Sequence, residues 1–223
     1  MYYKYGRVRK SRESVGEWNM KTTILCIGRQ YGSGGREVGE TLARRLGVVC
    51  YDKLLIQQAA KDAGMSEAAV ESGDEQPIGL GLAVSGNPFA DTAALNDAFY
   101  SERQRVFSAE RDAVLEIADR GPCVMIGRCA SSILRSAERD VLSVFIYADD
   151  DDRARRIARR NGIDAKAALR KMQKIDRMRR RYFDFYSDTP WGEPASYDLM
   201  LSSSCYGIDG TAEVILRAIT KEM

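Results

Sequence analysis

Five short apolar runs recur along the chain, and polar, helix-like stretches separate them. Most of the runs are continuously apolar rather than alternating, which is typical of parallel strands that are covered on both faces. We therefore predict a parallel sheet from the segments Thr23–Ile27, Val48–Tyr51, Cys123–Ile126, Val141–Tyr147 and Leu199–Leu201.

Helical spacing marks the stretches between these strands. In the first of them Val38, Leu42 and Leu46 fall on one face, and Gly47 follows as a C-cap. Alternating strands and helices predict right-handed crossovers and a doubly wound α/β fold with helices on both faces, whose ligands bind beyond the carboxyl ends of the strands. The predicted helices are Arg36–Leu46, Leu95–Arg120, Asp152–Asn161 and Thr211–Lys221, the last preceded by a turn over Gly207–Gly210.

Two segments fit poorly into such a sheet. Residues 53–94 combine a helical stretch with a segment rich in Gly, Pro and Ser, which predicts a mobile insert or lid. Residues 150–190 hold an arginine-rich helix followed by the aromatic run Tyr182–Tyr186. We expect a basic, flexible tail over residues 1–20 and one domain over 21–223, with an insert at about 53–108 and a lid at about 150–190.

A glycine-rich turn stands between the first strand and the first helix. Glycine lets the backbone approach an anion, and the helix N-terminus offers free N–H groups and a partial positive charge. The P-loop pattern is G-x-x-x-x-G-K-[ST]; aligned on Gly34, its first glycine is Arg29, its lysine is Gly35 and its hydroxyl residue is Arg36. We predict a phosphate cradle formed by Arg29, Gly32, Ser33, Gly34, Gly35, Arg36 and Glu37.

The lysine is missing, so another cation must supply its charge. We expect Arg36 to do so, with Arg29 as the second candidate and Arg156 closing from the lid. A βα turn without any ligand is the alternative interpretation.

Arginines and an aspartate at other strand ends extend this candidate site. Arg128 follows the third strand and is suited to grip a phosphate, although a structural salt bridge is the alternative. Asp52 follows the second strand and could bind a sugar or base, or cap the next helix. Helical spacing puts Arg153, Arg156 and Arg160 on one face, and a second group of arginines follows at 177 and 179–181. Such runs are often solvated helix faces; beside a phosphate cradle they predict a lid that excludes water.

Composition narrows the classes of function. The formal net charge of +2 gives no global reason to expect binding to nucleic acid or membranes. The chain has no histidine, which removes Ser-His and Cys-His catalysis and any histidine-based metal site. Cys26, Cys50 and Cys123 lie in or beside apolar runs and are expected to be buried free thiols, as in a cytoplasmic protein. The first 20 residues lack an apolar segment typical of a secretory signal, and no apolar run is long enough for a transmembrane helix.

With these features together, the chain resembles the nucleoside monophosphate kinases, and more closely the cytidylate kinase-like family of the P-loop superfamily. The resemblance implies a three-layer fold around a five-stranded parallel sheet, a helical insert that binds the nucleoside monophosphate, and an arginine lid. It covers residues 22 to about 218. The matching strings are IGRQYGSGGRE from Ile27, Tyr51-Asp52-Lys53, VMIGRCA from Val124, KIDRMR from Lys174, Trp191-Gly192 and Tyr197-Asp198-Leu199.

The resemblance also implies roles for individual residues. Arg128, and more loosely Arg103, would hold the acceptor phosphate, and Asp52 would lie near the acceptor nucleoside. The lid arginines Arg156, Arg160, Arg177 and Arg179 would contact the transferred phosphoryl group. The implied reaction uses ATP and Mg²⁺ and has CMP or dCMP as acceptor, with no metal ligand assigned to the protein. A nucleotide-binding regulator with little catalysis and a kinase for another small acceptor are the alternatives.

Overall fold

The sheet contains five parallel strands in the order β2-β3-β1-β4-β5. The structure, a computed structural model, describes residues 24–52, 55–56 and 92–220. All strand pairings are parallel, as the continuous apolar runs predict. The strands are β1 (Ile24–Arg29), β2 (Val49–Tyr51), β3 (Cys123–Ile126), β4 (Val141–Tyr147) and β5 (Leu199–Ser202).

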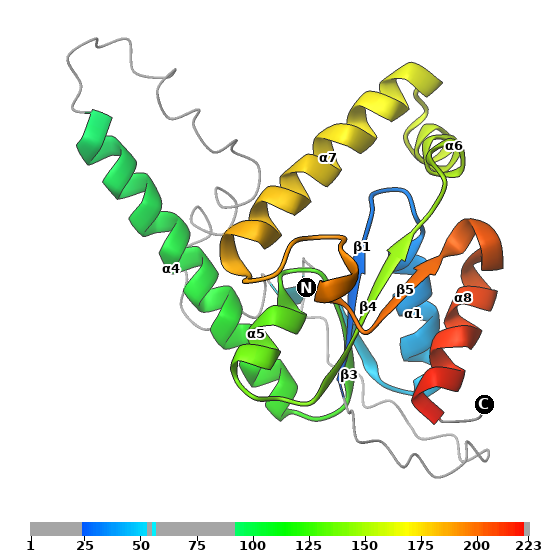
Figure 1. Cartoon of the computed structure of the whole chain (residues 1–223), viewed down its shortest axis with the longest axis horizontal. Helices are drawn as coiled ribbons and strands as arrows, with labels where there is room; N and C mark the ends of the chain where they lie inside the picture. The colour runs from blue at the N-terminus through cyan, green and yellow to red at the C-terminus, as the bar shows by residue number, and fades with distance from the viewer. Residues whose placement is uncertain (1–23, 53–54, 57–91, 221–223) are drawn as a thin grey trace, which may run out of the picture. The chain divides into compact units, whose positions relative to one another are not determined.

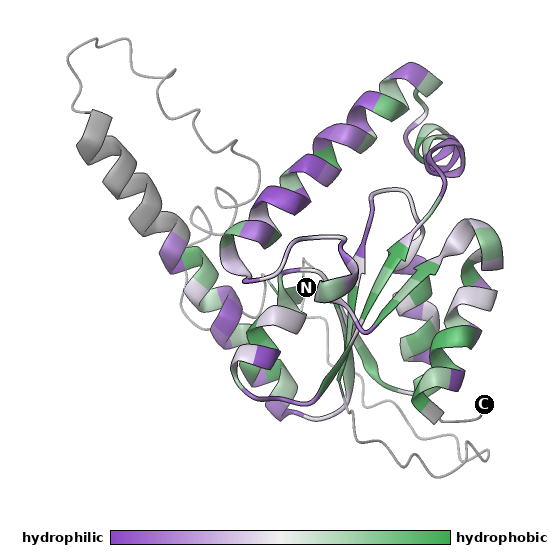
Figure 2. Cartoon of the chain, in the orientation of Figure 1, coloured by the Kyte–Doolittle hydropathy of each residue, from purple (hydrophilic) through white to green (hydrophobic). Residues whose placement is uncertain are grey.

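Helices α1 and α8 cover one face of the sheet (Figure 1). Their apolar side chains pack on alternate residues of the strands, such as Ile27 of β1 and Ile146 of β4. Figure 2 shows this apolar interior against the strongly polar helices α6 and α7, which lie beyond the carboxyl ends of the strands. The helices of this part of the chain are α1 (Gly35–Leu46), α5 (Ala130–Ser136), α6 (Asp150–Asn161), α7 (Ala165–Tyr186), the 3₁₀ helix η2 (Pro194–Ser196) and α8 (Ser203–Thr220).

The chain divides into two compact units. One contains Met1–Asp52 and Gly121–Met223, and the other is Lys53–Arg120. Of the second unit, the structure describes Leu55, Ile56 and the helix α4 (Thr92–Asp119) with the residue after it. The predicted tail over 1–20 and most of the predicted insert, including its Gly-, Pro- and Ser-rich stretch, lie outside the described residues, so these boundaries stay predictions.

Three elements differ from the sequence-based expectation. The turn predicted over Gly207–Gly210 is present only as a kink at Gly207, whose angles (φ 67°, ψ −178°) are non-helical, and the three residues after Gly207 already belong to the helical part of α8 that follows. The aromatic run Tyr182–Tyr186 is the last part of α7 rather than a segment after a helix. Helix α5 was not predicted, because its seven residues are too few to show a helical period. No described helix is both long and apolar enough to cross a membrane.

The face of the sheet opposite α1 carries an aromatic cluster. Phe145 of β4 lies between Trp191 and Tyr197, with ring centroids 5.1 Å and 4.8 Å away. Gly28 of β1 gives these rings their space: a β-carbon at this position would lie 2.7 Å from Cε1 of Tyr197 and 2.9 Å from Cδ2 of Phe145. The cluster therefore requires a residue without a side chain at position 28.

We expect Gly28→Ala to destabilise the fold by about 1–3 kcal/mol, the usual cost of an extra methyl group in a packed core. Gly210→Ala, on α8, is the matched control, because its nearest contact is Cβ of Tyr206 at 3.3 Å. Urea unfolding of both variants measures the difference. Equal unfolding midpoints for Gly28→Ala and the parent would show that the aromatic cluster is loosely packed.

The cysteines are free thiols throughout, and Cys26, Cys123 and Cys129 are buried whereas Cys205 is exposed. Burial raises the pKa of Cys50 and of Cys123 to about 12. The thiolate is the reactive form, so only about 10⁻⁴ of either thiol is ionised at pH 8. We expect iodoacetamide to modify Cys205 first and the others only after unfolding, as read by peptide mass spectrometry. Modification of Cys50 or Cys123 at the rate of Cys205 would contradict their burial.

Candidate functional site

The turn between β1 and α1 presents backbone N–H groups at the carboxyl edge of the sheet. Gly32 and Gly34 adopt the left-handed conformation, with φ of 82° and 78°. The first intrahelical bond runs from Val38 N to Gly34 O at 2.9 Å, so the N–H groups of Gly35, Arg36 and Glu37 precede it. The N-cap residue, Gly34, has no side chain to cap this helix end. Three N–H groups and the helix dipole are therefore available to an anion.

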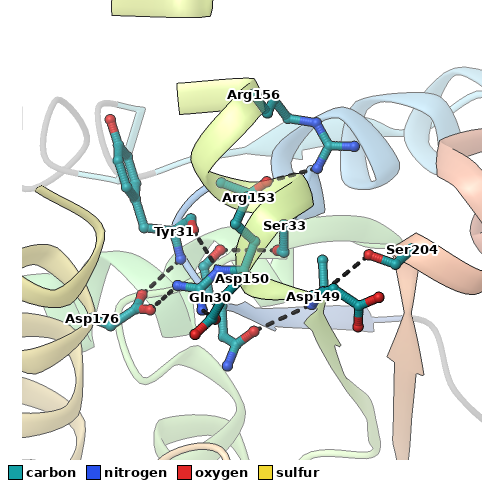
Figure 3. A network of polar contacts seen from close by, with 11 residues as sticks. Gln30, Tyr31, Ser33, Asp149, Asp150, Arg153, Arg156, Asp176 and Ser204 are labelled. Carbon is teal, nitrogen blue, oxygen red and sulfur yellow. Dashed lines mark hydrogen bonds and ion pairs between the residues drawn. The ribbon is translucent and has the colours of Figure 1, made fainter. Parts of the chain in front are cut away.

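Arginines of α6 and α7 donate hydrogen bonds to the carbonyl groups in and before the same turn. Arg156 donates to Gly32 O at 2.6 Å, and Arg153 donates through Nε to Tyr31 O at 2.9 Å (Figure 3). Arg179 of α7 donates to Arg29 O at 3.0 Å. Because these three carbonyls accept hydrogen bonds from α6 and α7, the conformation of the turn is fixed by both helices.

Serine hydroxyls complete the support of the turn. Ser203, at the end of β5, donates to Ser33 O at 2.5 Å. The hydroxyl of Ser33 itself donates to Gln30 O at 2.9 Å, within the turn. The predicted phosphate-binding residue Ser33 is thus fully buried and turned toward the loop, so its side chain has a structural contact.

A buried ion pair joins α6, α7 and the turn. Asp176 of α7 accepts a hydrogen bond from Tyr31 N at 2.7 Å and pairs with Arg153 of α6 (Figure 3). Arg153 also pairs with Asp150 at 2.9 Å, and its side chain is only 4% exposed. Burial raises the pKa of Asp176, while the Tyr31 N–H and Arg153 oppose that rise. The carboxylate of Asp176 therefore links both α6 and α7 to the glycine turn.

The ring of Tyr31 lies beneath two of the predicted lid arginines. The guanidinium carbons of Arg160 and Arg179 stand 5.3 Å and 5.5 Å from the ring centroid, within cation–π distance. Arg156, Arg160 and Arg179 are thus brought together at the turn. Arg177 is exposed, and no ion pair or hydrogen bond involves it among the residues that the structure describes.

Arg29 crosses the edge of the sheet from β1 toward β3. A β-carbon at Gly35 would lie 2.6 Å from Cβ of Arg29, so the side chain of Arg29 starts in the space beside that glycine. Its guanidinium reaches the place that a β-carbon of Gly127 would occupy. In this sheet order β1 and β3 flank the point where the chain reverses its winding, which is where ligands bind in open α/β sheets.

The turn after β3 brings a second arginine to the same crevice. Gly127, Arg128 and Cys129 all have positive φ, at 80°, 58° and 53°. For two residues with side chains this is an uncommon backbone, of the kind that collects at functional sites. Arg128 is buried, 8% exposed, and its guanidinium lies 5.5 Å from the ring centroid of Tyr182.

The remaining predicted residues lie farther out or in the other unit. Arg36 is 57% exposed and pairs with Glu40 at 2.9 Å and with Asp52 at 3.0 Å. The hydrogen bond that Arg36 donates to Glu40 and the charge of Asp52 raise the pKa of Arg36. Arg103 lies on α4, in the unit Lys53–Arg120.

The described residues offer no ready ligand set for Mg²⁺. The P-loop position that carries the hydroxyl ligand is Arg36 here, and Ser33 uses its hydroxyl within the turn. In the described part of the chain no three carboxylate, cysteine or histidine side chains gather as a metal site.

Sequence reasoning missed several residues that build this site. Tyr31 and Asp176 stand in strings that carry the resemblance, but no chemical pattern gave them a contact with each other, 145 residues apart. Arg153 was placed on the correct helix face without a role, and Ser203 followed a strand without any motif. Arg153 follows Asp150 at the i,i+3 spacing of a helical ion pair, but Arg155 follows Asp152 at the same spacing, so the sequence did not single out the buried arginine.

The family model described as the cytidylate kinase-like family matches residues 24–205. A cytidylate kinase of Methanopyrus kandleri is 25% identical over 209 residues, covering 89% of this chain and 93% of its own. One of Methanocaldococcus jannaschii is 29% identical over 123 residues, covering 54% of this chain and 68% of its own.

Solved structures share the fold. An uncharacterized protein from Eubacterium ventriosum superposes with a TM-score of 0.67 at 27% identity, covering 89% of this chain and 98% of its own. A shikimate kinase from Bacteroides thetaiotaomicron has a TM-score of 0.52 at 13% identity, covering 88% and 98% of the two chains. The architecture is that of P-loop kinases.

Proposed function

The chain belongs to the cytidylate kinase-like family, and from that membership and the site we propose that it transfers the γ-phosphoryl group of ATP to a nucleoside monophosphate, CMP or dCMP. One observation carries the proposal. The free N–H groups of the glycine turn and the guanidiniums of Arg29, Arg128 and Arg179 meet at one edge of the sheet. Phosphoryl transfer needs positioning and positive charge and little covalent chemistry from the protein, and this edge supplies both.

Each part of the site has a role in this proposal. The N–H groups of Gly35 and its two successors hold the donor phosphates, and Arg128 grips the acceptor phosphate. Arg156 and Arg160 stand on the lid, where they screen the reacting groups from water. Asp52 is suited to bind the acceptor nucleoside, with Arg36 holding its carboxylate at 3.0 Å. Mg²⁺, when bound with ATP, neutralises phosphate charge.

A nucleotide-binding regulator with little catalysis is the second candidate, and Gly35 favours it because the P-loop lysine is absent. A kinase for another small acceptor is the third, since the relatives named cytidylate kinases are only distantly similar. Both share the phosphate cradle with the main proposal, so binding of ATP alone does not separate the three functions.

A panel of acceptors separates them. The protein is incubated with ATP, Mg²⁺ and each of CMP, dCMP, UMP, AMP and GMP, and nucleoside diphosphates are resolved by anion-exchange chromatography. We expect CDP or dCDP to form fastest. ATP binding by calorimetry without any diphosphate product would favour the regulator, and ADP formed only with another acceptor would favour the third function.

A further inference from the structure

We infer that Arg29, and not Arg36, supplies the positive charge that the P-loop lysine supplies to the transferred phosphoryl group in ordinary P-loop kinases. The inference rests on the proposed function and names the catalytic cation within it. The observation behind it is that the side chain of Arg29 occupies the space that β-carbons at Gly35 and at Gly127 would need.

The absence of a lysine at position 35 and the position of the Arg29 side chain are linked by packing. A β-carbon at Gly35 would lie 2.6 Å from Cβ and 3.2 Å from Cγ of Arg29, and 3.3 Å from Cβ of Ile146. Real β-carbons essentially never come within 3.0 Å of another atom, so the 2.6 Å contact with Cβ of Arg29 would force a shift. The stem of Arg29 therefore fills the space through which a lysine at position 35 would leave the helix.

The guanidinium of Arg29 is delivered to the crevice by a second glycine. It occupies the place of a β-carbon at Gly127, which also adopts a positive φ of 80°. The charged group thus lies between the ends of β1 and β3, next to the turn that carries Arg128. In this position it stands between the cradle for the donor phosphates and the arginine proposed to grip the acceptor.

The positive charges gathered around Arg29 also favour the binding of an anion. Burial and the nearby guanidiniums of Arg179 and Arg128 lower the pKa of Arg29, and among its principal neighbours only Asp52 acts against them. Burial lowers the pKa of Arg179 as well. Like charges held together in this way are relieved when a polyanion enters, because its charge offsets their repulsion.

The two rival arginines are already engaged elsewhere. Arg36 is 57% exposed and divides its guanidinium between Glu40 and Asp52. Arg156 donates to Gly32 O at 2.6 Å, on the carbonyl side of the turn, where it supports the loop. Arg29 makes contact with both glycines through its side chain while its carbonyl is held by Arg179 at 3.0 Å.

The test moves the charge from one position to the other. Arg29→Met keeps the stem and removes the charge, and Gly35→Lys adds a lysine against the stem. Arg29→Gly/Gly35→Lys removes both Cβ and Cγ of residue 29, the two atoms that a β-carbon at position 35 would meet, and restores the ordinary P-loop lysine. We expect Arg29→Met to lower kcat for CDP formation by about 10³-fold, as loss of an arginine finger does, with a much smaller change in the Kd for ATP. Gly35→Lys alone should unfold at a lower temperature than the parent.

The double variant tests most directly whether a lysine at position 35 can replace the charge of Arg29. We expect it to exceed the single Arg29→Gly variant in kcat by at least tenfold, because the lysine then enters the vacated space, and to unfold at a higher temperature than Gly35→Lys. Arg45→Ala, on the exposed end of α1, is the control and should keep the parental kcat.

A parental kcat in Arg29→Met would overturn the inference and leave the proposed function standing. A parent that forms no diphosphate with any acceptor would overturn the proposed function, and the inference with it. If Arg29→Gly does not fold, Arg29→Met decides.

Discussion

Replacement of Arg128 by alanine is expected to raise the KM for CMP by about 100-fold and to leave the Kd for ATP within about threefold of the parent. A hydrogen bond to a charged group contributes about 1.5–3 kcal/mol, and a bidentate arginine–phosphate contact has two of them. The donor phosphates keep their N–H cradle, which is built from the other side of the crevice. Steady-state kinetics with varied CMP, together with ATP titration by calorimetry, measure the two effects.

The control for this variant is Arg139→Ala. Arg139 is exposed and precedes β4, at the amino edge of the sheet and away from the proposed site. We expect its KM for CMP to match that of the parent. Equal KM values for Arg128→Ala and Arg139→Ala would remove Arg128 from the acceptor site, and a large loss of ATP affinity in Arg128→Ala would place it on the donor side.

Replacement of Arg153 by alanine is expected to destabilise the protein by about 3–5 kcal/mol, the range found when one partner of a buried ion pair is removed. The side chains of Arg153 and Asp176 are 4% and 17% exposed, so the carboxylate would keep the hydrogen bond from Tyr31 N but lose the guanidinium that pairs with it. The bond from Arg153 to Tyr31 O would be lost as well. Urea unfolding at pH 7 measures the change.

Arg155→Ala is the matched control for this prediction. It lies on the same helix, is 70% exposed and pairs with Asp152, so its removal should change stability by less than about 1 kcal/mol. Adding Asp176→Asn to Arg153→Ala should recover part of the loss, because the unpaired charge is then gone. A stability change in Arg153→Ala no larger than that in Arg155→Ala would show that the lid is not fastened through this pair.

The framework of the fold could be predicted because its strands are continuously apolar. Cys123–Ile126 and Val141–Tyr147 have the bounds that the sequence indicates, and Gly47 ends α1 in the left-handed conformation. These features are local: a run of buried residues and a C-cap are both visible within a few positions. Turn signals are local too: Gly207 does interrupt α8, although the three residues after it already lie in the helical part that follows.

The choice between Arg29 and Arg36 could not be made from the sequence. Both flank the glycine turn, and Arg36 was the first choice although it begins the helix. Only the packing of Arg29 against Gly35 and Gly127, 98 positions along the chain from Arg29, separates them. The same holds for Asp176 and Tyr31, because their contact depends on how α7 packs against the turn after β1.

The most direct test of one shared phosphoryl-transfer site is calorimetric titration with a bisubstrate analogue, cytidine and adenosine joined 5′ to 5′ by five phosphates. A site that holds ATP on the glycine turn and CMP on Arg128 predicts one analogue bound per chain, tighter than ATP or CMP alone, and displaced by either. Affinity should fall in both Arg29→Met and Arg128→Ala. An analogue that binds no more tightly than ATP, while ATP and CMP bind without excluding it, would contradict the account.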